Sequence, residues 1–161
     1  MVEVKINGLS DLRAALLKLP QALDRKVLNG ALSKGAILMR NKSRSNASAF
    51  HRTGTLERNI RSRTGRPREG MTATVIVGVR KLSNKQVRQF KMVHRKGGRA
   101  NPNDPFYWRF MEFGFTDRGG KWHAGKSFLR NAFETTKFAA VDAITIALRE
   151  RIAKEAEKLR R

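Results

Sequence analysis

One window of the sequence, from Asp104 to Glu134, holds nine of the twelve aromatic side chains and constrains the fold most strongly. Aromatic side chains bury large apolar areas, so such a concentration predicts the position of the core. Phe106, Phe110 and Phe113 recur at steps of four and three residues, which is the spacing of one face of a helix. We therefore predict a short aromatic helix whose Phe face is buried.

Both ends of this helix carry recognisable signals. Asp104 is a candidate N-cap, Pro105 suits the first helical position, and Gly114 suits the left-handed residue that closes a helix. A second helix is predicted to begin after a cap at Ser127. The residues expected to form the core signature of the two helices are Phe106, Phe110, Phe113, Gly114, Phe128, Leu129 and Phe133.

The rest of the chain alternates between helix-like and strand-like patterns. Residues 2–6 read as a strand, and residues 10–19 read as a short helix. A longer helix follows Pro20, with Gly35 on its apolar face marking a close contact with another element. Residues 71–79 alternate as a strand, with residues 61–64 as the hairpin partner, and residues 136–161 read as a final helix.

These elements predict an α+β fold in a single domain spanning residues 1–161. A small antiparallel sheet would be packed by the long helix of the N-terminal half and the long C-terminal helix. Basic loops are expected at about residues 40–69 and 80–103, the second being an excursion that contains a helix after Ser83.

The formal net charge of +22 indicates a chain that lies beside polyanions or packs against acidic neighbours. Much of this charge falls in the two basic segments, which contain very few acidic residues. Such a segment is either a solvated loop or a surface that faces a polyanion or a partner protein. The candidate DNA-facing or partner-facing residues are Arg40, Lys42, Arg44, Arg52, Arg58, Arg61, Arg63, Arg66, Arg68, Lys85, Arg88, Lys91, Arg95, Lys96 and Arg99.

Catalytic and metal-binding patterns are missing from the sequence. The three histidines, His51, His94 and His123, are too far apart for a local metal motif, and there is no cysteine. Nucleases that use two metal ions need clustered carboxylates, whereas Glu112 and Glu134 are expected to pair with nearby arginines. No catalytic residue, cofactor or metal ion is predicted, nor any membrane-spanning segment.

Three blocks of sequence occur in an informative order. They are Arg52 to Leu56 (Arg-Thr-Gly-Thr-Leu), Tyr107 to Gly114 (Tyr-Trp-Arg-Phe-Met-Glu-Phe-Gly) and Lys126 to Glu134 (Lys-Ser-Phe-Leu-Arg-Asn-Ala-Phe-Glu). Together they resemble the neck-associated tail-completion (minor tail) proteins of long-tailed bacteriophages. That family usually has Thr where Phe115 stands and Pro where Ser127 stands, so local loop geometry is expected to differ.

The resemblance covers about residues 6 to 150 and implies a non-enzymatic virion protein of the tail–neck junction. Members of this family would form a homo-oligomeric ring, with six subunits expected, assembled in the host cytoplasm. The ring would contact the tail terminator, the head-closure proteins and the tail tube, with genomic DNA passing through or near its lumen. Two alternatives remain open at this stage: a stand-alone nucleic-acid-binding protein and the tail terminator of the same neck.

Overall fold

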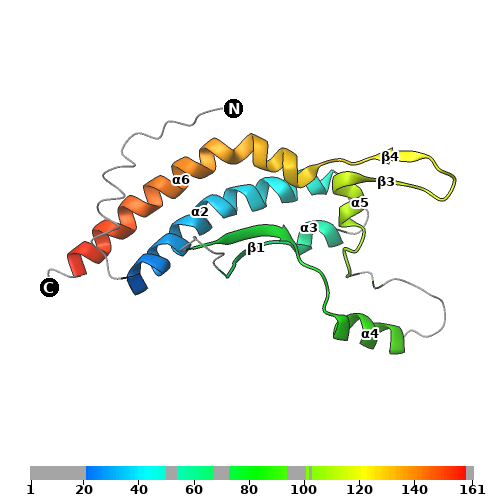
Figure 1. Ribbon diagram of the computed structural model, residues 1–161, viewed down its shortest axis with the longest axis horizontal. Coiled ribbons are helices and arrows are strands. Elements are labelled where there is room, and N and C mark those ends of the chain that lie inside the picture. Colours follow the sequence, from blue (N-terminus) through cyan, green and yellow to red (C-terminus); the bar gives the residue numbers. More distant parts are fainter. Residues whose placement is uncertain (1–20, 50–53, 67–72, 94–100, 102, 159–161) are drawn as a thin grey trace.

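Two long helices lie side by side along the length of the molecule in a computed structural model of the chain (Figure 1). The structure describes residues 21–49, 54–66, 73–93, 101 and 103–158. Helix α2 spans Gln21–Ser48 and helix α6 spans Phe128–Lys158. The strand predicted at residues 2–6 and the helix predicted at residues 10–19 lie outside the described residues.

Helix α2 is the central element, because it contacts both α6 and the hairpin formed by β1 and β2. Val27 and Ala31 of α2 form one core cluster with Ala147 and Leu148 of α6. At Gly35, a Cβ atom would lie 2.7 Å from the side chain of Ile144 and 2.8 Å from a backbone carbonyl of α6. The glycine therefore permits the close approach of the two helices that its position on the apolar face predicted.

Helix α6 is one continuous helix of 31 residues. The sequence pattern predicted two helices here, one beginning near Ser127 and another at residue 136, and that division was wrong. Neither glycine nor proline interrupts residues 128–158. Thr135 and Thr136 instead donate their hydroxyl groups to the carbonyls of Asn131 and Ala132 one turn earlier, so the helix continues through them.

Strand β1 (Ile60–Thr64) pairs antiparallel with strand β2 (Val75–Val79), and Ile60 lies opposite Val79. This confirms the predicted hairpin, although β2 begins later than expected. Because residues directly opposite each other share a face, Ile60, Ser62 and Thr64 face α2, whereas Arg61 and Arg63 lie on the outer face. Long helices packed on a small antiparallel sheet confirm the α+β class.

Three short helices and a second hairpin surround this framework. Helix α3 (Thr55–Asn59) leads into β1, and helix α4 (Asn84–Val93) lies away from the two long helices (Figure 1). Helix α5 (Trp108–Phe113) is followed by a second hairpin, formed by β3 (Gly114–Thr116) and β4 (Trp122–Ala124). This second hairpin was not predicted. It projects from the end of the molecule where α5 lies (Figure 1).

Candidate functional site

The first basic segment is mostly regular structure, which corrects the prediction of a loop at residues 40–69. Arg40, Lys42 and Arg44 lie on the last turns of α2, and Arg58 lies on α3. The helix continues through this serine-rich stretch because tertiary contacts favour it. Ser43 and Ala47 are buried, and the Asn46 side chain donates a hydrogen bond to the carbonyl of Phe128 over 3.1 Å.

Two of the predicted arginines make internal contacts. The Nε of Arg44 donates to the carbonyl of Ile60 over 3.0 Å and so joins α2 to β1. Arg40 donates two hydrogen bonds to the side-chain oxygen of its neighbour Asn41. These guanidinium groups already have acceptors, and Arg44 has a structural role.

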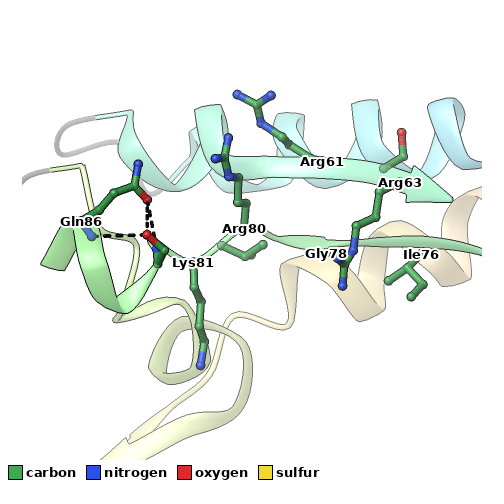
Figure 2. A pocket seen from close by; sticks show the side chains of 10 residues that line it. Arg61, Arg63, Ile76, Gly78, Arg80, Lys81 and Gln86 are labelled. Carbon is green, nitrogen blue, oxygen red and sulfur yellow. Dashed lines mark hydrogen bonds between the residues drawn. The ribbon is translucent and has the colours of Figure 1, made fainter. Parts of the chain in front are cut away.

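A different set of cations borders a groove of about 620 Å³ on the outer face of the β1–β2 hairpin (Figure 2). Arg61 and Arg63 come from β1, and Arg80 and Lys81 follow directly after β2. In Figure 2, Arg61 and Arg80 extend to one side of the strand pair, and Arg63 and Lys81 extend to the other. We call these four residues the basic groove. Arg80 and Lys81 were in the second basic segment but not among the fifteen candidate residues.

The hairpin register explains how the basic groove forms. Arg61 lies opposite Gly78 and Arg63 lies opposite Ile76, so each arginine has an uncharged cross-strand neighbour on the outer face. A Cβ atom at Gly78 would meet no heavy atom within 4 Å, which shows how open this face is. None of the residues that line the groove is acidic.

Helix α4 is attached to the groove through a local cap. The hydroxyl of Ser83 accepts a hydrogen bond from the amide of Gln86, and the side-chain oxygen of Gln86 accepts one from the amide of Ser83. This reciprocal capping box fixes the first turn of α4 at the edge of the groove, as the predicted Ser83 cap implied. Lys85, Arg88 and Lys91 are exposed along α4.

The remaining basic candidates that the structure describes are not among the residues that line the basic groove. Arg66 is exposed just after β1, and Arg58 lies on the exposed side of α3. Arg52, Arg68, Arg95, Lys96 and Arg99 lie outside the described residues, as does His94. The structure therefore brings together Arg61 and Arg63 with two cations from beyond β2, and leaves Arg40, Lys42 and Arg44 on a helix.

The prediction that the Phe face of the aromatic helix lies in the core was wrong for the single chain. Phe106, Phe110 and Phe113 are about half exposed, with Phe113 at 59%. Helix α5 begins at Trp108 rather than Pro105, and Tyr107 rather than Asp104 precedes its first residue. The buried face of this segment carries Tyr107, Trp108 and Met111 instead, which pack against the cluster of Ala47, Leu56, Ile60 and Phe128.

Phe128 is fully buried in that cluster, and Leu129 packs against it. Phe133 is 49% exposed, because it lies at the edge of an apolar groove between α2, β2 and α6. Exposed apolar side chains therefore gather at two places. One is the end formed by α5, β3 and β4, and the other is α6, where Phe138 and Ile146 are exposed on the side of the helix that points away from Phe133.

We call the first of these places the aromatic tip. The rings of Phe110 and Phe115 are 5.4 Å apart, and Phe115 stacks on His123 at 4.9 Å. Trp122 is 60% exposed and follows the register onto the other face of the β3–β4 hairpin. The aromatic tip consists of Phe106, Phe110, Phe113, Phe115 and Trp122.

Glu112 holds the aromatic tip to the helix pair. Its carboxylate is 5% exposed and accepts hydrogen bonds from the amides of Leu129 at 2.9 Å and Arg130 at 3.0 Å. It therefore caps α6, a role that the sequence had assigned to Ser127. The expected pairing of Glu112 with an arginine was also wrong, because Arg109 instead lies 5.6 Å from the ring centre of Trp108.

Gly114 closes α5 with a φ of 86°, as its position in the sequence predicted. A Cβ atom there would lie 2.6 Å from the carbonyl oxygen of His123, so a side chain at this position would force β3 and β4 apart. Asp117 then makes the turn of the hairpin, accepting hydrogen bonds from the amides of Gly119 and Lys121. A hydrogen bond with His123 at 2.9 Å, together with these amides, lowers the pKa of the Asp117 carboxyl.

No cluster of three or more histidine, aspartate or glutamate side chains that could hold a metal ion occurs within the described residues. Among the same residues, no helix has the length and apolar character needed to cross a membrane.

Comparison with known proteins gives one match. The family described as "Bacteriophage HK97-gp10, putative tail-component" matches residues 10–114. The matched region includes α2 through α5 and ends at Gly114, the first residue of β3, so it leaves out the rest of the second hairpin and α6. No curated protein and no solved structure matches the chain.

Proposed function

Because the chain belongs to the HK97-gp10-like family of phage tail components, we propose that it is a structural subunit of the junction between the tail and the neck of the virion. A tail component is a virion protein that acts together with other tail proteins. A structural role of this kind fits a protein that is not an enzyme. In the proposed role, copies of the chain assemble into a closed ring around the path of the DNA.

The observation that carries this proposal is the exposure of the aromatic tip. Five large aromatic side chains are exposed within one short segment, although a soluble monomer rarely displays a large contiguous apolar patch. Aromatic residues are also the type most enriched at the centres of protein interfaces. The aromatic tip is therefore well suited to bind another subunit or another tail protein.

A closed ring needs two unlike surfaces on each subunit, because a head-to-tail contact joins one patch to a different patch of the next copy. The aromatic tip lies at one end of the molecule, and Phe138 and Ile146, both more than half exposed on α6, provide a second apolar patch. This arrangement supports a ring built from heterologous contacts. Six subunits is the number we propose, by resemblance to tail-completion proteins.

The other proposed partners are the tail terminator, the head-closure proteins and the tail tube. The formal net charge of +22 supports a position beside DNA or beside acidic neighbouring proteins. The same charge favours a second candidate function, a stand-alone nucleic-acid-binding protein. The aromatic tip separates the two candidates, since binding to phosphates does not require exposed phenylalanine.

The deciding experiment measures the mass of the purified, nuclease-treated protein at moderate salt, with and without tail tubes. We expect a closed ring, either alone or on the tube. Replacing Phe113 and Trp122 with serine should abolish the ring, whereas replacing Met92 and Val93 with serine should not. The second pair is a matched control, because both side chains are exposed and lie on α4.

A chain that stays monomeric with tail tubes would refute the proposal. If that monomer also bound DNA in a salt-sensitive way, the stand-alone nucleic-acid-binding function would replace it.

A further inference from the structure

We infer that the basic groove is a binding site for the phosphate backbone of double-stranded DNA. The inference rests on the proposed position of the chain beside the DNA path, and it assigns that contact to particular residues. It starts from a difference between the arginines of the chain. The guanidinium groups of Arg40 and Arg44 donate hydrogen bonds to acceptors within the chain. Those of Arg61, Arg63 and Arg80 donate none within the described part of the chain.

The charged side chains of the basic groove form no hydrogen bond or ion pair with any residue that the structure describes, although the backbone of Arg80 donates to Asn59. They border one groove without a carboxylate in its lining, so they repel one another in the free chain. A bound polyanion removes this repulsion and releases its own counterions. The groove is therefore arranged to receive negative charge.

The shape of the charged region favours a regular polymer over a single acidic side chain. The cations begin on β1, continue through Arg80 and Lys81, and extend onto α4 with Lys85, Arg88 and Lys91. Double-stranded DNA carries one negative charge for about every 1.7 Å of its axis, so it can engage cations that are spread over several elements. The net charge of +22 disfavours a second copy of this chain as the occupant.

The lining also indicates which part of DNA is contacted. No aromatic side chain lines the groove, so stacking on unpaired bases is not available there. The side-chain oxygen of Gln86 is already engaged with Ser83, which leaves it unable to read a base edge as an acceptor. The charged side chains of the lining are arginine and lysine, which bind phosphates of any sequence. We therefore assign the contact to the phosphate backbone.

The test replaces all four cations of the basic groove with glutamine in the full chain. Binding to a labelled DNA duplex of random sequence is then measured across a range of salt concentrations. Each phosphate contact contributes about 0.9 to the slope of log affinity against log salt, so the slope should fall by roughly 3 to 4. Affinity at about 0.1 M salt should fall at least roughly tenfold.

The matched control removes the same amount of charge elsewhere. Lys26, Lys34, Arg149 and Lys154 are exposed on the two long helices, and their joint replacement with glutamine should change the slope by less than about one. A second variant, in which Arg61, Arg63 and Arg80 become lysine, keeps the charge and should retain the slope. All variants replace exposed side chains, and urea unfolding confirms that each one folds.

Three results would overturn the inference. The slope of log affinity against log salt could fall by the same amount in the groove variant and in the control variant, which would show diffuse attraction without a site. The groove variant could bind DNA like the wild type. It could also bind DNA normally while losing affinity for polyglutamate, which would assign the groove to an acidic protein.

Ring formation, measured by mass without DNA on the same variants, tests the proposed function separately. The groove variant should still assemble. The wild-type chain could form no ring while the groove variant still shows the reduced salt dependence of DNA binding. That result would refute the ring and leave the DNA site intact.

Discussion

Replacing Glu112 with alanine tests whether one buried carboxylate joins the aromatic tip to the helix pair. The Glu112 carboxylate caps the first turn of α6 through the amides of Leu129 and Arg130. Around it, the amides of Lys126 and Ser127 donate to the carbonyls of Met111 and Glu112 over 2.6 and 3.2 Å. All of these donors lie on residues 126–130 and all of the acceptors on Met111 and Glu112, so several hydrogen bonds tie the start of α6 to the end of α5.

The expected cost follows from the two bonds to the carboxylate. A hydrogen bond to a charged group contributes about 1.5–3 kcal/mol, so the pair contributes at most about 3–6 kcal/mol. Water that enters the space left by Glu112→Ala restores part of this for the two amides. We therefore expect a loss of about 3 kcal/mol in the free energy of unfolding. Glu112→Gln retains one acceptor and should lose about half as much.

Urea unfolding followed by circular dichroism measures these differences. Glu134→Ala is the matched control, since Glu134 lies on α6, the helix that Glu112 caps, with an exposed side chain paired to Lys137. An exposed pair of this kind contributes at most about 1 kcal/mol, so the control should unfold almost like the wild type. If Glu112→Ala cost no more than Glu134→Ala, the carboxylate would not be holding the two elements together.

Three further outcomes are expected. Gly35→Ala should lower the free energy of unfolding by about 1–3 kcal/mol because its Cβ would clash with α6, whereas Gly78→Ala, in open space, should be close to neutral. Equal effects of the two substitutions in urea unfolding would contradict the close approach of α2 and α6. Phe128→Ala should cost about 3–5 kcal/mol in the same assay, whereas Phe113→Ala should leave the unfolding of the single chain nearly unchanged. The pKa of Asp117 should lie below its ordinary value of 3.8, mainly because of the hydrogen bond from the imidazole of His123. The ionised carboxyl therefore stabilises the β3–β4 turn above pH 3.8, and this stabilisation is lost as the pH falls through the lowered pKa. An NMR titration of the carboxyl with a midpoint at or above 3.8 would disprove this.

Periodic patterns in the sequence were enough to predict the elements that frame the fold. Helix α2 was predicted from its three-four spacing, the first hairpin from alternation, and the start of α4 from the Ser83 cap. Each of these signals is local, since it depends on residues a few positions apart. Elements of this kind can be predicted because each signal lies within the sequence of the element itself.

The prediction of which face of the aromatic helix is buried was wrong for a different reason. Its helix has apolar residues on two faces, one with Phe106, Phe110 and Phe113 and one with Tyr107 and Met111. Periodicity predicts that a face is apolar, but it does not say which apolar face a neighbouring element covers. The three-phenylalanine face was chosen because it is larger, and the structure buries the other.

The candidate site depended on contacts between residues far apart in the sequence. Arg61 and Arg63 meet Arg80 and Lys81 only through the register of the hairpin, and Glu112 reaches its amide partners from 17 and 18 residues away. No local pattern marks such pairs. The strand alternation at residues 61–64, combined with the predicted hairpin, was the one signal that could have placed the two arginines on an outer face.

The order of α2 and α6 along the chain has a consequence for synthesis on the ribosome. About eighty residues separate Ser48, where α2 ends, from Phe128, where α6 begins, and at about 5–20 residues per second their translation takes roughly 4–16 s. Throughout that interval Val27 and Ala31 lack the partner that buries them. The nascent chain is then both apolar and strongly basic, beside ribosomal RNA, so its first seconds are the period in which it most needs a chaperone.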